Sequence, residues 1–330
     1  MRLLAFLFAC AVTCSQATHA QQEPILIRFS HVVASDAPKG KAAERFRQLA
    51  EQATGGRVRV RIYSNSELYR DREELEALQL GAVEMIAPSL SKLGPLGARE
   101  FQVFDLPFLF PDRAALHRVT KGPIGEGMLQ RLRLRGVIGL AFWDNGFKSF
   151  SADRPLRVPS DMTGLRMRIQ PSRVLDAQMR ALGAQPMTLA FGEVHDALAA
   201  GVVDGTENPP SNFYTQDMQE VQPYFTVSNH GYLGYAVIVN RKFWEGLPPD
   251  IRRELEGAMR EATSYADSIA QEENDRALAA IRESGKTQIR LLTEQELDAW
   301  KTALATVSTA MEAHIGAELI ASIRRTVAAP

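Results

Sequence analysis

An asparagine that precedes two prolines is well placed for fixed hydrogen bonding. The stretch DGTENPPSNFYTQ covers residues 204–216. Proline fixes its own backbone and keeps the preceding residue out of the helical region, so Pro209 and Pro210 should hold Asn208 extended. A side-chain amide held in this way donates and accepts hydrogen bonds at a set position. Two interpretations are open: a ligand-binding amide, or an ordinary connection into a helix with Ser211 or Asn212 as its cap.

Motifs for metal binding and catalysis are missing from the sequence. The histidines after residue 20 are scattered, with no pair at metal-ligand spacing and no cysteine beside them. There is no nucleophile elbow, no HExxH helix and no Gly-rich phosphate loop between a strand and a helix. GPIGEG (122–127) follows a helical pattern and is predicted to be a loop. We therefore expect no metal and no cofactor, and the residues give an enzyme no visible chemistry.

The N-terminal stretch MRLLAFLFACAVTCSQATHAQQ is typical of a secretory signal peptide. It has one positive residue, an apolar run from Leu3 to Val12, and small residues before a predicted cleavage site after about Ala20. The run is far short of the roughly 20 residues that span a bilayer, although Cys10 leaves a lipoprotein site open. Both cysteines precede the cleavage site, so we expect an exported chain without a disulfide.

Charge and length restrict the class of protein further. Without Arg2, 37 basic residues face 39 acidic ones, so no large basic field exists and nucleic-acid partners are not expected. No later window approaches 18 consecutive apolar residues, which predicts a mature chain without a membrane span. About 310 residues can form a stable core, and this length favours two lobes.

Strand and helix periods alternate along the chain, which predicts an α/β fold. Strands are expected at 25–31, 58–64, 83–88, 136–143, 164–169, 185–190, 202–207 and 232–240, with helices at 38–54, 72–80 and from about 193. The first part is a βαβαβ unit with a parallel sheet. Residues 249–284 form one long helix, or two end to end, of roughly 50 Å, which should tie both lobes together. We assign 21–145 with about 234–272 to lobe I, and 146–233 with about 273–330 to lobe II.

Several long motifs resemble one protein family over essentially the whole mature chain. They are GLRMRIQPS, AFGEVHDALAAGVVDGTENPPSNFYTQ and GYLGYAVIVNRKFW, preceded by NSELYRDREELEALQLGAVEM, FDLPFLF and WDNGFKSFSADRPL. These resemble the DctP-type solute receptors of tripartite ATP-independent periplasmic (TRAP) transporters, most of all the C4-dicarboxylate branch. The resemblance implies a two-lobed periplasmic binding protein fold, with a ligand cleft between the lobes and a long helix spanning both.

The resemblance also implies a set of ligand-binding residues. It implies that Arg168 binds the substrate carboxylate, and a planar guanidinium suits bidentate hydrogen bonding to a carboxylate. It places Asn208 on the same carboxylate, with Phe191 lining the cleft. Arg166 lies two residues before Arg168 and is interpreted as a solvent-facing residue. The family usually has a serine and a tyrosine where Gly192 and His195 stand, so the identity of the ligand stays open.

A dicarboxylate needs a second cationic contact, and polar residues should line the remaining cleft. The cationic candidates are Lys39, Arg70, Lys92 and Lys148, and a surface position is the default interpretation of each. Lys39, Arg70 and Lys148 are favoured because they lie in loops that follow or join strands, so Lys92 keeps its interpretation as a surface lysine. The further lining candidates are Ser89, Ser91, His31, Trp143, Asn145 and Tyr235.

The leading hypothesis is therefore a monomeric periplasmic receptor that captures a small organic anion, such as malate, succinate or fumarate, and hands it to TRAP permease membrane subunits. A secreted enzyme acting on the same acids is the alternative. A third hypothesis is a subunit that presents its ligand to a sensor kinase.

Overall fold

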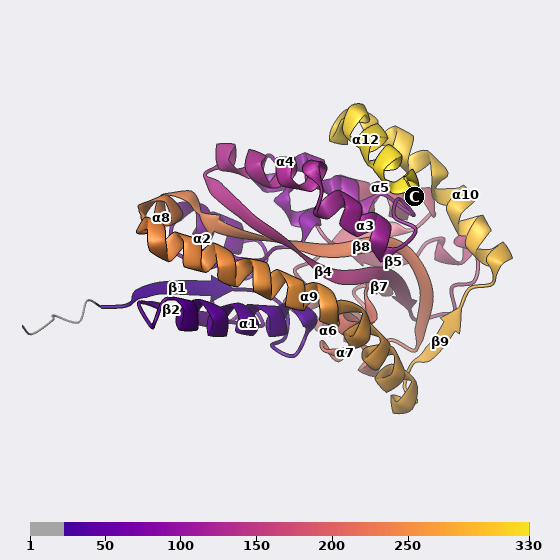
Figure 1. Ribbon diagram of the computed structural model, residues 1–330. Helices are drawn as coiled ribbons and strands as arrows, with labels where there is room; N and C mark the ends of the chain where they lie inside the picture. The colour runs from indigo at the N-terminus through magenta and orange to yellow at the C-terminus, as the bar shows by residue number, and fades with distance from the viewer. Residues whose placement is uncertain (1–22, 330) are drawn as a thin grey trace, which may run out of the picture.

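The computed structural model describes residues 23–329, so the predicted signal peptide (1–20) lies outside the described residues. Nine strands form one sheet in the order β2-β1-β3-β8-β4-β7-β5-β6, with β9 also paired to β8 (Figure 1). The strands are β1 (Ile25–Ser30), β2 (Val58–Tyr63), β3 (Met85–Ile86), β4 (Val137–Ala152), β5 (Arg166–Ile169), β6 (Gln185–Thr188), β7 (Gly205–Asn208), β8 (Tyr224–Asn240) and β9 (Gln288–Leu291).

Helices cover this sheet and its ends. The α-helices are α1 (Pro38–Ala53), α2 (Glu74–Leu80), α3 (Arg113–Thr120), α4 (Pro123–Arg131), α5 (Arg173–Ala181), α6 (Val194–Ala199), α7 (Pro210–Tyr214), α8 (Arg241–Gly246), α9 (Pro249–Ser284), α10 (Glu294–Ala310), α11 (Glu312–Ile315) and α12 (Ala317–Ala328). The short 3-10 helices are η1 (Leu90–Leu96), η2 (Arg99–Asp105), η3 (Leu132–Arg135), η4 (Pro159–Met162), η5 (Phe191–Glu193) and η6 (Met218–Glu220).

Two long antiparallel strands connect the two ends of the sheet. β4 has 16 residues and β8 has 17, so both run well beyond the strands predicted at 136–143 and 232–240. At one end they adjoin the parallel strands β2, β1 and β3, and at the other the parallel strands β7, β5 and β6. Their pairing shifts register between Asp144 and Gly146, where Gly146 faces Leu233. The predicted boundaries at 145 and 233 fall at this shift and remain predictions.

The long helix α9 matches the predicted span of 249–284 and lies across the molecule in Figure 1. Pro249 begins the helix at a position that needs no amide donor, and Gly285 ends it in a left-handed conformation. The helix contacts segments far apart in sequence: Lys41 of α1 pairs with Glu273 at 2.6 Å, and the amide of Ser211 donates to Asn274 Oδ1 at 3.0 Å. These contacts support the prediction that α9 braces both parts of the sheet.

The segment GPIGEG is helical, so its prediction as a loop was wrong. Gly122 is the N-cap of α4 and Pro123 is its first residue. A Cβ atom on Gly122 would lie 2.4 Å from the carbonyl oxygen of Arg118, and one on Gly125 would lie 2.3 Å from that of Thr120. The glycines therefore allow α4 to begin directly against the end of α3, which is a packing requirement that local sequence does not reveal.

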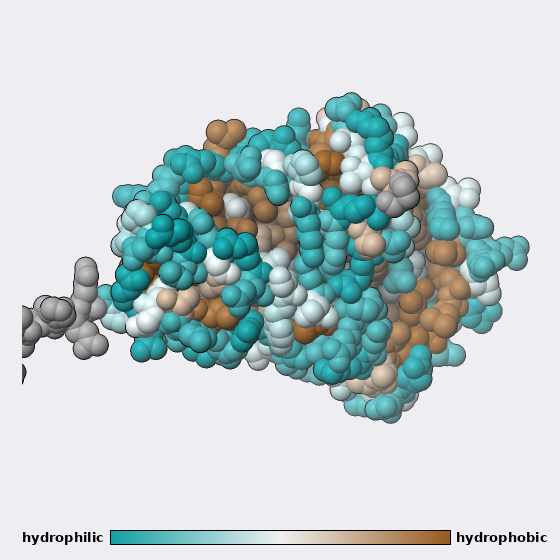
Figure 2. All heavy atoms as spheres, viewed as in Figure 1, coloured by the Kyte–Doolittle hydropathy of each residue, from teal (hydrophilic) through white to brown (hydrophobic). Residues whose placement is uncertain are grey.

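Polar residues cover most of the face seen in Figure 2, and hydrophobic residues gather in a recess between α4 and α9. A cavity of about 600 Å³ lies here, lined by side chains that include Leu129, Leu140, Phe142 and Met259. Within residues 23–329, no helix combines the length and the apolar character needed to cross a bilayer.

Candidate ligand-binding site

The predicted ligand-binding residues gather where parallel strands end. His31 directly follows β1, Ser89 follows β3, and Arg168 and Asn208 lie at or near the carboxyl ends of β5 and β7. Ligands of open α/β sheets bind beyond the carboxyl ends of the strands, so this is the expected place for a site.

Arg168 lies on β5 and is 1% exposed. Its Nε and Nη2 atoms donate to the carbonyl oxygen of Leu189, at 3.1 and 2.9 Å. Among residues 23–329, Nη1 donates no hydrogen bond, so the outer edge of the guanidinium formed by Nη1 and Nη2 keeps donors for a ligand. Burial lowers the pKa of Arg168, but an arginine remains charged at neutral pH. The side chain can therefore serve as a rigid carboxylate receptor.

Asn208 lies on the same face of the sheet as Arg168. Arg168 is paired in register with Thr206 of β7, and Asn208 is two residues further along that strand. The Asn208 Nδ2 atom lies 3.4 Å from Thr206 Oγ1. The helix α7 begins two residues after Asn208, at Pro210. The extended conformation expected for Asn208 is confirmed. The helix cap suggested for Ser211 or Asn212 is not, because Pro209 is the N-cap and both residues lie within α7.

Phe191 and Asp71 connect the Arg168 region to the loop before α2. The Phe191 ring lies 5.7 Å from Arg168 Cζ, and its backbone amide donates to the Asp71 carboxylate. Asp71 also forms an ion pair with Lys92, whose side chain is 5% exposed. The interpretation of Lys92 as a surface lysine was therefore wrong, because the buried carboxylate of Asp71 holds it inside.

Lys39 is a buried cation near the start of α1. Its Nζ atom donates to the carbonyl oxygen of Ala87 at 2.9 Å and lies 4.0 Å from the centre of the Tyr235 ring. Burial lowers the pKa of Lys39 from 10.5 to about 7, against the opposing charges of Glu74 and Asp71. Lys39 retains two donors that no residue between 23 and 329 occupies, so it is suited to a second anionic group.

His31 and Ser89 lie close to this group of residues. His31 is fully buried, and burial lowers its pKa to about 3, so the ring is neutral at physiological pH. Neither of its ring nitrogens has a hydrogen-bond partner among the described residues. Ser89 donates to Gln170 Oε1, just beyond β5, and so connects segments assigned to different lobes.

Tyr235 and Asn145 belong to a chain of buried side-chain hydrogen bonds. The Tyr235 hydroxyl accepts from Asn212 Nδ2 at 3.2 Å and donates to Asn145 Oδ1 at 3.4 Å. Asn145 Nδ2 in turn donates to Asn212 Oδ1 at 3.1 Å. Burial raises the pKa of Tyr235, so the hydroxyl keeps its proton and this chain stays intact.

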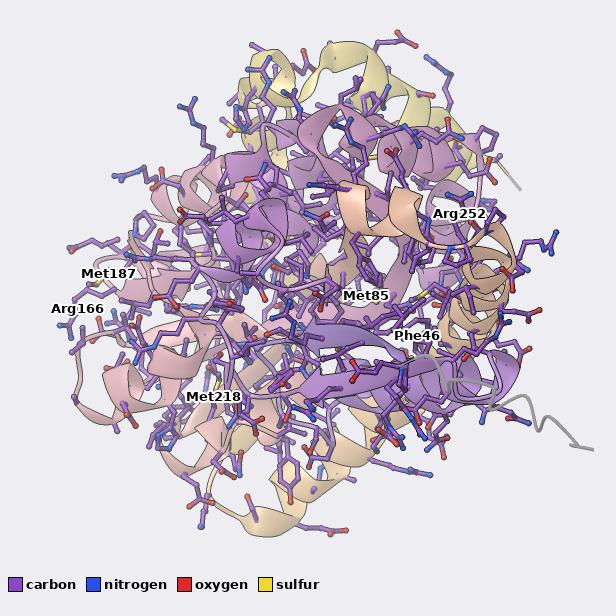
Figure 3. The ribbon with its side chains drawn as sticks, turned by 90° about the vertical axis from the view of Figure 1, so that its left-hand side faces the viewer. Phe46, Met85, Arg166, Met187, Met218 and Arg252 are labelled. Atoms are coloured by element: carbon purple, nitrogen blue, oxygen red, sulfur yellow. The ribbon has the colours of Figure 1, made fainter. Side chains whose placement is uncertain are left out.

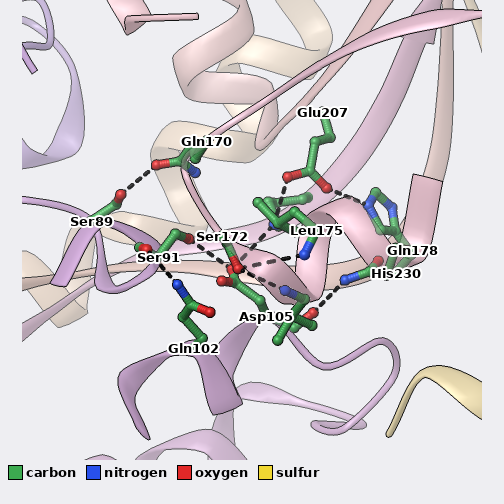
Figure 4. A network of polar contacts seen from close by, with 12 residues as sticks. Ser89, Ser91, Gln102, Asp105, Gln170, Ser172, Leu175, Gln178, Glu207 and His230 are labelled. Atoms are coloured by element: carbon green, nitrogen blue, oxygen red, sulfur yellow. Dashed lines mark hydrogen bonds and ion pairs between the residues drawn. The ribbon is translucent and has the colours of Figure 1, made fainter. Parts of the chain in front are cut away.

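Lys148 belongs to a separate buried network, part of which is shown in Figure 4. Its Nζ atom lies 2.7 Å from Glu207 and 3.6 Å from Asp105, and its side chain is 0% exposed. Glu207 alternates with Thr206 and Asn208 along β7, so this network lies on the opposite face from Arg168. Ser91 donates to Asp105 at 2.7 Å in the same network. The structure thus separates Lys148 and Ser91 from the other candidates.

Electrostatics explains why this network is stable. Burial alone would raise the pKa of Glu207, but Lys148 and His230 outweigh it and lower that pKa to about 2. His230 Nε2 lies 2.9 Å from Glu207, and the His230 ring stacks on Phe150 at 3.7 Å. Burial raises the pKa of Asp105. Lys148 is therefore neutralised by its own carboxylates and provides no cation for a ligand.

The remaining residues named from the sequence have core or surface positions. Trp143 is a core residue that packs on Phe29 and donates from Nε1 to Thr263 Oγ1 at 3.0 Å. Arg70 is exposed, unlike its neighbour Asp71. Arg166 pairs with Asp204 at 2.5 Å with its side chain 40% exposed, in agreement with its surface assignment, and Figure 3 places it at the periphery. His195 is also partly exposed, beside Asp196.

Among residues 23–329, one group of side chains has metal-ligand chemistry. His117, Asp144 and Asp267 place ligand atoms within 4.8 Å of one another, although they come from three different elements. Arg113 lies 2.9 Å from Asp144, and Lys121 lies 2.7 Å from Asp267. Both carboxylates already have cationic partners, so their charge is balanced without a metal.

Sequence reasoning missed Asp71, Glu74, Gln170 and Asn212. Asp71 and Glu74 occur in the charged run YRDREELE, which is typical of a solvated helix start, yet both are buried. Burial raises the pKa of Glu74 from 4.5 to about 7, with Asp71 adding to the rise and Lys92 and Lys39 opposing it. A cue was available at Asn212, because it follows the two prolines that Asn208 precedes.

Comparisons with known proteins agree with this fold and site. A model of the bacterial extracellular solute-binding proteins of family 7, DctP, matches residues 29–314. The chain is 57% identical to the C4-dicarboxylate-binding periplasmic protein DctP of Rhodobacter capsulatus, over 97% of this chain and 96% of that protein. The chain belongs to the DctP family of solute-binding proteins, which are receptors that work with TRAP membrane subunits.

Two solved structures share the fold. A TRAP periplasmic solute-binding protein from Shewanella oneidensis with bound succinate has a TM-score of 0.90 and 39% identity, covering 92% of this chain and 100% of that chain. One from Pseudomonas aeruginosa with bound L-malate has a TM-score of 0.85 and 43% identity, covering 87% and 100%. The predicted family and the two-lobed α/β fold class are confirmed.

Proposed function

We propose that this protein is the periplasmic receptor of a TRAP transporter, and that it binds a C4-dicarboxylate such as succinate, malate or fumarate for delivery to the permease. The observation that carries the proposal is the pair of buried cations with unused donors, Arg168 and Lys39. Arg168 and Asn208 hold one carboxylate in this proposal, and Lys39 holds the other. The ligands named for relatives in the same family support the choice of acid.

Arg70 and Lys148 have no role in the proposed binding set. Arg70 is exposed, and Lys148 is neutralised by Glu207 and Asp105 on the other face of the sheet. Phe191, His31, Ser89, Asn145 and Tyr235 complete the proposed lining, because each contacts or adjoins Arg168, Lys39 or the loops that carry them. Burial of both ligand charges against matched cations gives selectivity for dianions.

A thermal-shift screen with organic acids, followed by calorimetry, tests the proposal. A ligand at 100 times its dissociation constant adds about 2.7 kcal/mol to stability, which is a clear rise in the unfolding midpoint. We expect succinate, malate or fumarate to give this rise, and butyrate and succinamide, which lack one or both charges, to give little. No rise with any dicarboxylate contradicts the proposal.

Further assays address location, assembly and turnover. We propose cleavage after about Ala20, a monomeric mature chain and no catalysis. Mass spectrometry of the exported protein checks the cleavage site, and light scattering checks the oligomeric state. Product analysis after incubation with each acid checks for catalysis. Conversion of a bound acid by the pure protein would instead support the enzyme hypothesis.

A further inference from the structure

Glu74 is a buried acid without a hydrogen-bond partner. It is the first residue of α2 and is 1% exposed. Neither of its carboxylate oxygens has a hydrogen-bond partner among residues 23–329. A buried carboxylate in this situation is costly, and proteins retain one mainly where a ligand, a proton or water satisfies it.

The charged groups that affect the pKa of Glu74 come from three segments: Lys39 from α1, Asp71 from the loop before α2, and Lys92 from η1. Lys92 and Asp71 form an ion pair with each other. Lys39 donates only to the Ala87 carbonyl oxygen and forms no salt bridge with a described residue. Glu74 and Lys39 are therefore the two ionisable groups of this cluster that lack a direct partner of opposite charge.

A charge count shows what a dicarboxylate changes. The buried cations around the proposed site are Lys39, Lys92 and Arg168, and the buried anions are Asp71 and Glu74. His31 is neutral, as the low pKa of its buried ring requires. With all five groups ionised, the empty site carries one net positive charge. Binding of a dianion changes the total to one net negative charge, which is costly in a desolvated site.

We propose that Glu74 is a ligand-binding residue that takes up one proton from solvent when a dicarboxylate binds. The proton converts the Glu74 carboxylate to a carboxyl group, whose O–H donates to the ligand carboxylate at the Lys39 end. The bound site is then neutral, and the uncompensated acid has an acceptor for its proton. This inference rests on the proposed function, and it assigns Glu74 to selection of ligands by charge.

A monocarboxylate follows a different course. Its single negative charge balances the site with Glu74 ionised, so no proton is needed. A monocarboxylate also leaves Glu74 without a hydrogen-bond partner, which disfavours the complex. Proton uptake by Glu74 is therefore specific to dianionic ligands.

Calorimetry of succinate binding in phosphate and Tris buffers between pH 7 and 9 measures the proton uptake, because the two buffers differ in ionisation enthalpy. Each proton taken up weakens binding about tenfold per pH unit above the pKa of the empty site. Glu74→Gln is a neutral mimic of the carboxyl group. We expect its succinate affinity to depend less steeply on pH than that of wild type, with a difference of about one factor of ten per pH unit, which corresponds to one proton. Glu76→Gln on the exposed side of α2 should keep the wild-type slope.

The outcomes distinguish proton uptake by Glu74 from proton uptake by Lys39. A wild-type affinity that does not change between pH 7 and 9, or a Glu74→Gln slope equal to that of wild type, overturns the inference. If the variant does not fold, difference infrared spectroscopy of ¹³C-glutamate-labelled wild type decides the matter. Succinate should produce the C=O stretch of a labelled protonated carboxyl, and its absence overturns the inference. Failure to bind any dicarboxylate is a distinct result, which refutes the proposed function itself.

Discussion

The carbonyl oxygen of Leu189 accepts two hydrogen bonds from Arg168, at 3.1 Å from Nε and 2.9 Å from Nη2. This contact fixes the plane of the guanidinium. The outer edge of the group is thereby preorganised for a carboxylate, and little side-chain entropy remains to be lost on binding.

Arg168→Lys should fold normally and lose most of its ligand affinity. An ammonium cannot hold Leu189 and also present two parallel donors, so we expect the dissociation constant to rise at least about tenfold. Calorimetry with succinate measures the change. Arg166→Lys is the matched control, because Arg166 lies on the same strand but pairs with Asp204 at the surface. Equal affinities for both variants would contradict the assignment of Arg168.

Asn208→Ala should weaken binding less than the loss of Arg168. It removes a hydrogen bond to a charged acceptor, which contributes about 1.5–3 kcal/mol, while the salt bridge remains. Asn208→Asp should weaken binding more than the alanine variant, since it places a negative charge beside the ligand carboxylate. Dissociation constants that follow another order would return the ENPP segment to its interpretation as a helix connection.

Glu207 should make the protein sensitive to acid. Its pKa is lowered from 4.5 to about 2, so its contribution to stability is present above pH 4.5 and is lost as the pH falls through 2. The shift corresponds to about 3 kcal/mol. Urea unfolding across this range should show the loss in wild type and in the exposed control Glu76→Gln. Glu207→Gln should lack this component and be less stable at neutral pH, because Lys148 loses the closer of its two carboxylate partners and keeps only Asp105 at 3.6 Å.

Gly146→Ala should destabilise the protein by about 1–3 kcal/mol. Gly146 has a φ of 146°, and an added Cβ atom would lie 2.6 Å from Asn274 Nδ2 on α9. Gly127→Ala is the control, because Gly127 lies within α4 with open space around it. This variant should be more stable than wild type by roughly 0.5–1 kcal/mol. Thermal or urea unfolding compares the two, and equal stability changes would argue against strain at Gly146.

Ligand binding should make the protein more compact. Contacts from both proposed lobes to one ligand form together only when the cleft closes, which shifts the population toward a closed state. We expect succinate to reduce the radius of gyration in small-angle scattering without changing the helix content, and Arg168→Lys not to compact at the same concentration. An unchanged scattering profile with a ligand that binds by calorimetry would rule out closure on binding.

Local periodicity was enough to predict most of the fold. The span of α9, the βαβαβ unit at the start and the strand that carries Arg168 were correctly located, because burial on one face imposes a repeat of 3.6 or 2 residues. The strand predicted at 202–207 ends one residue before Asn208, which lies in β7. β4 and β8 extend further than predicted, since their outer halves gain regular pairing only from strands distant in sequence. The helix at GPIGEG was missed because its glycines are explained by contact with α3.

The sequence by itself determined which residue types are available and how the strands present them. Pro209 and Pro210 constrain Asn208 locally, and the order of strands and helices defines the α/β class. Only the tertiary structure decided which charges are compensated. Lys148 meets Glu207 from 59 positions away, and Asp71 meets Phe191 from 120 positions away. An ionisable group's charge state depends on burial and on neighbours within a few ångströms, and those neighbours come from parts of the chain that no local pattern connects.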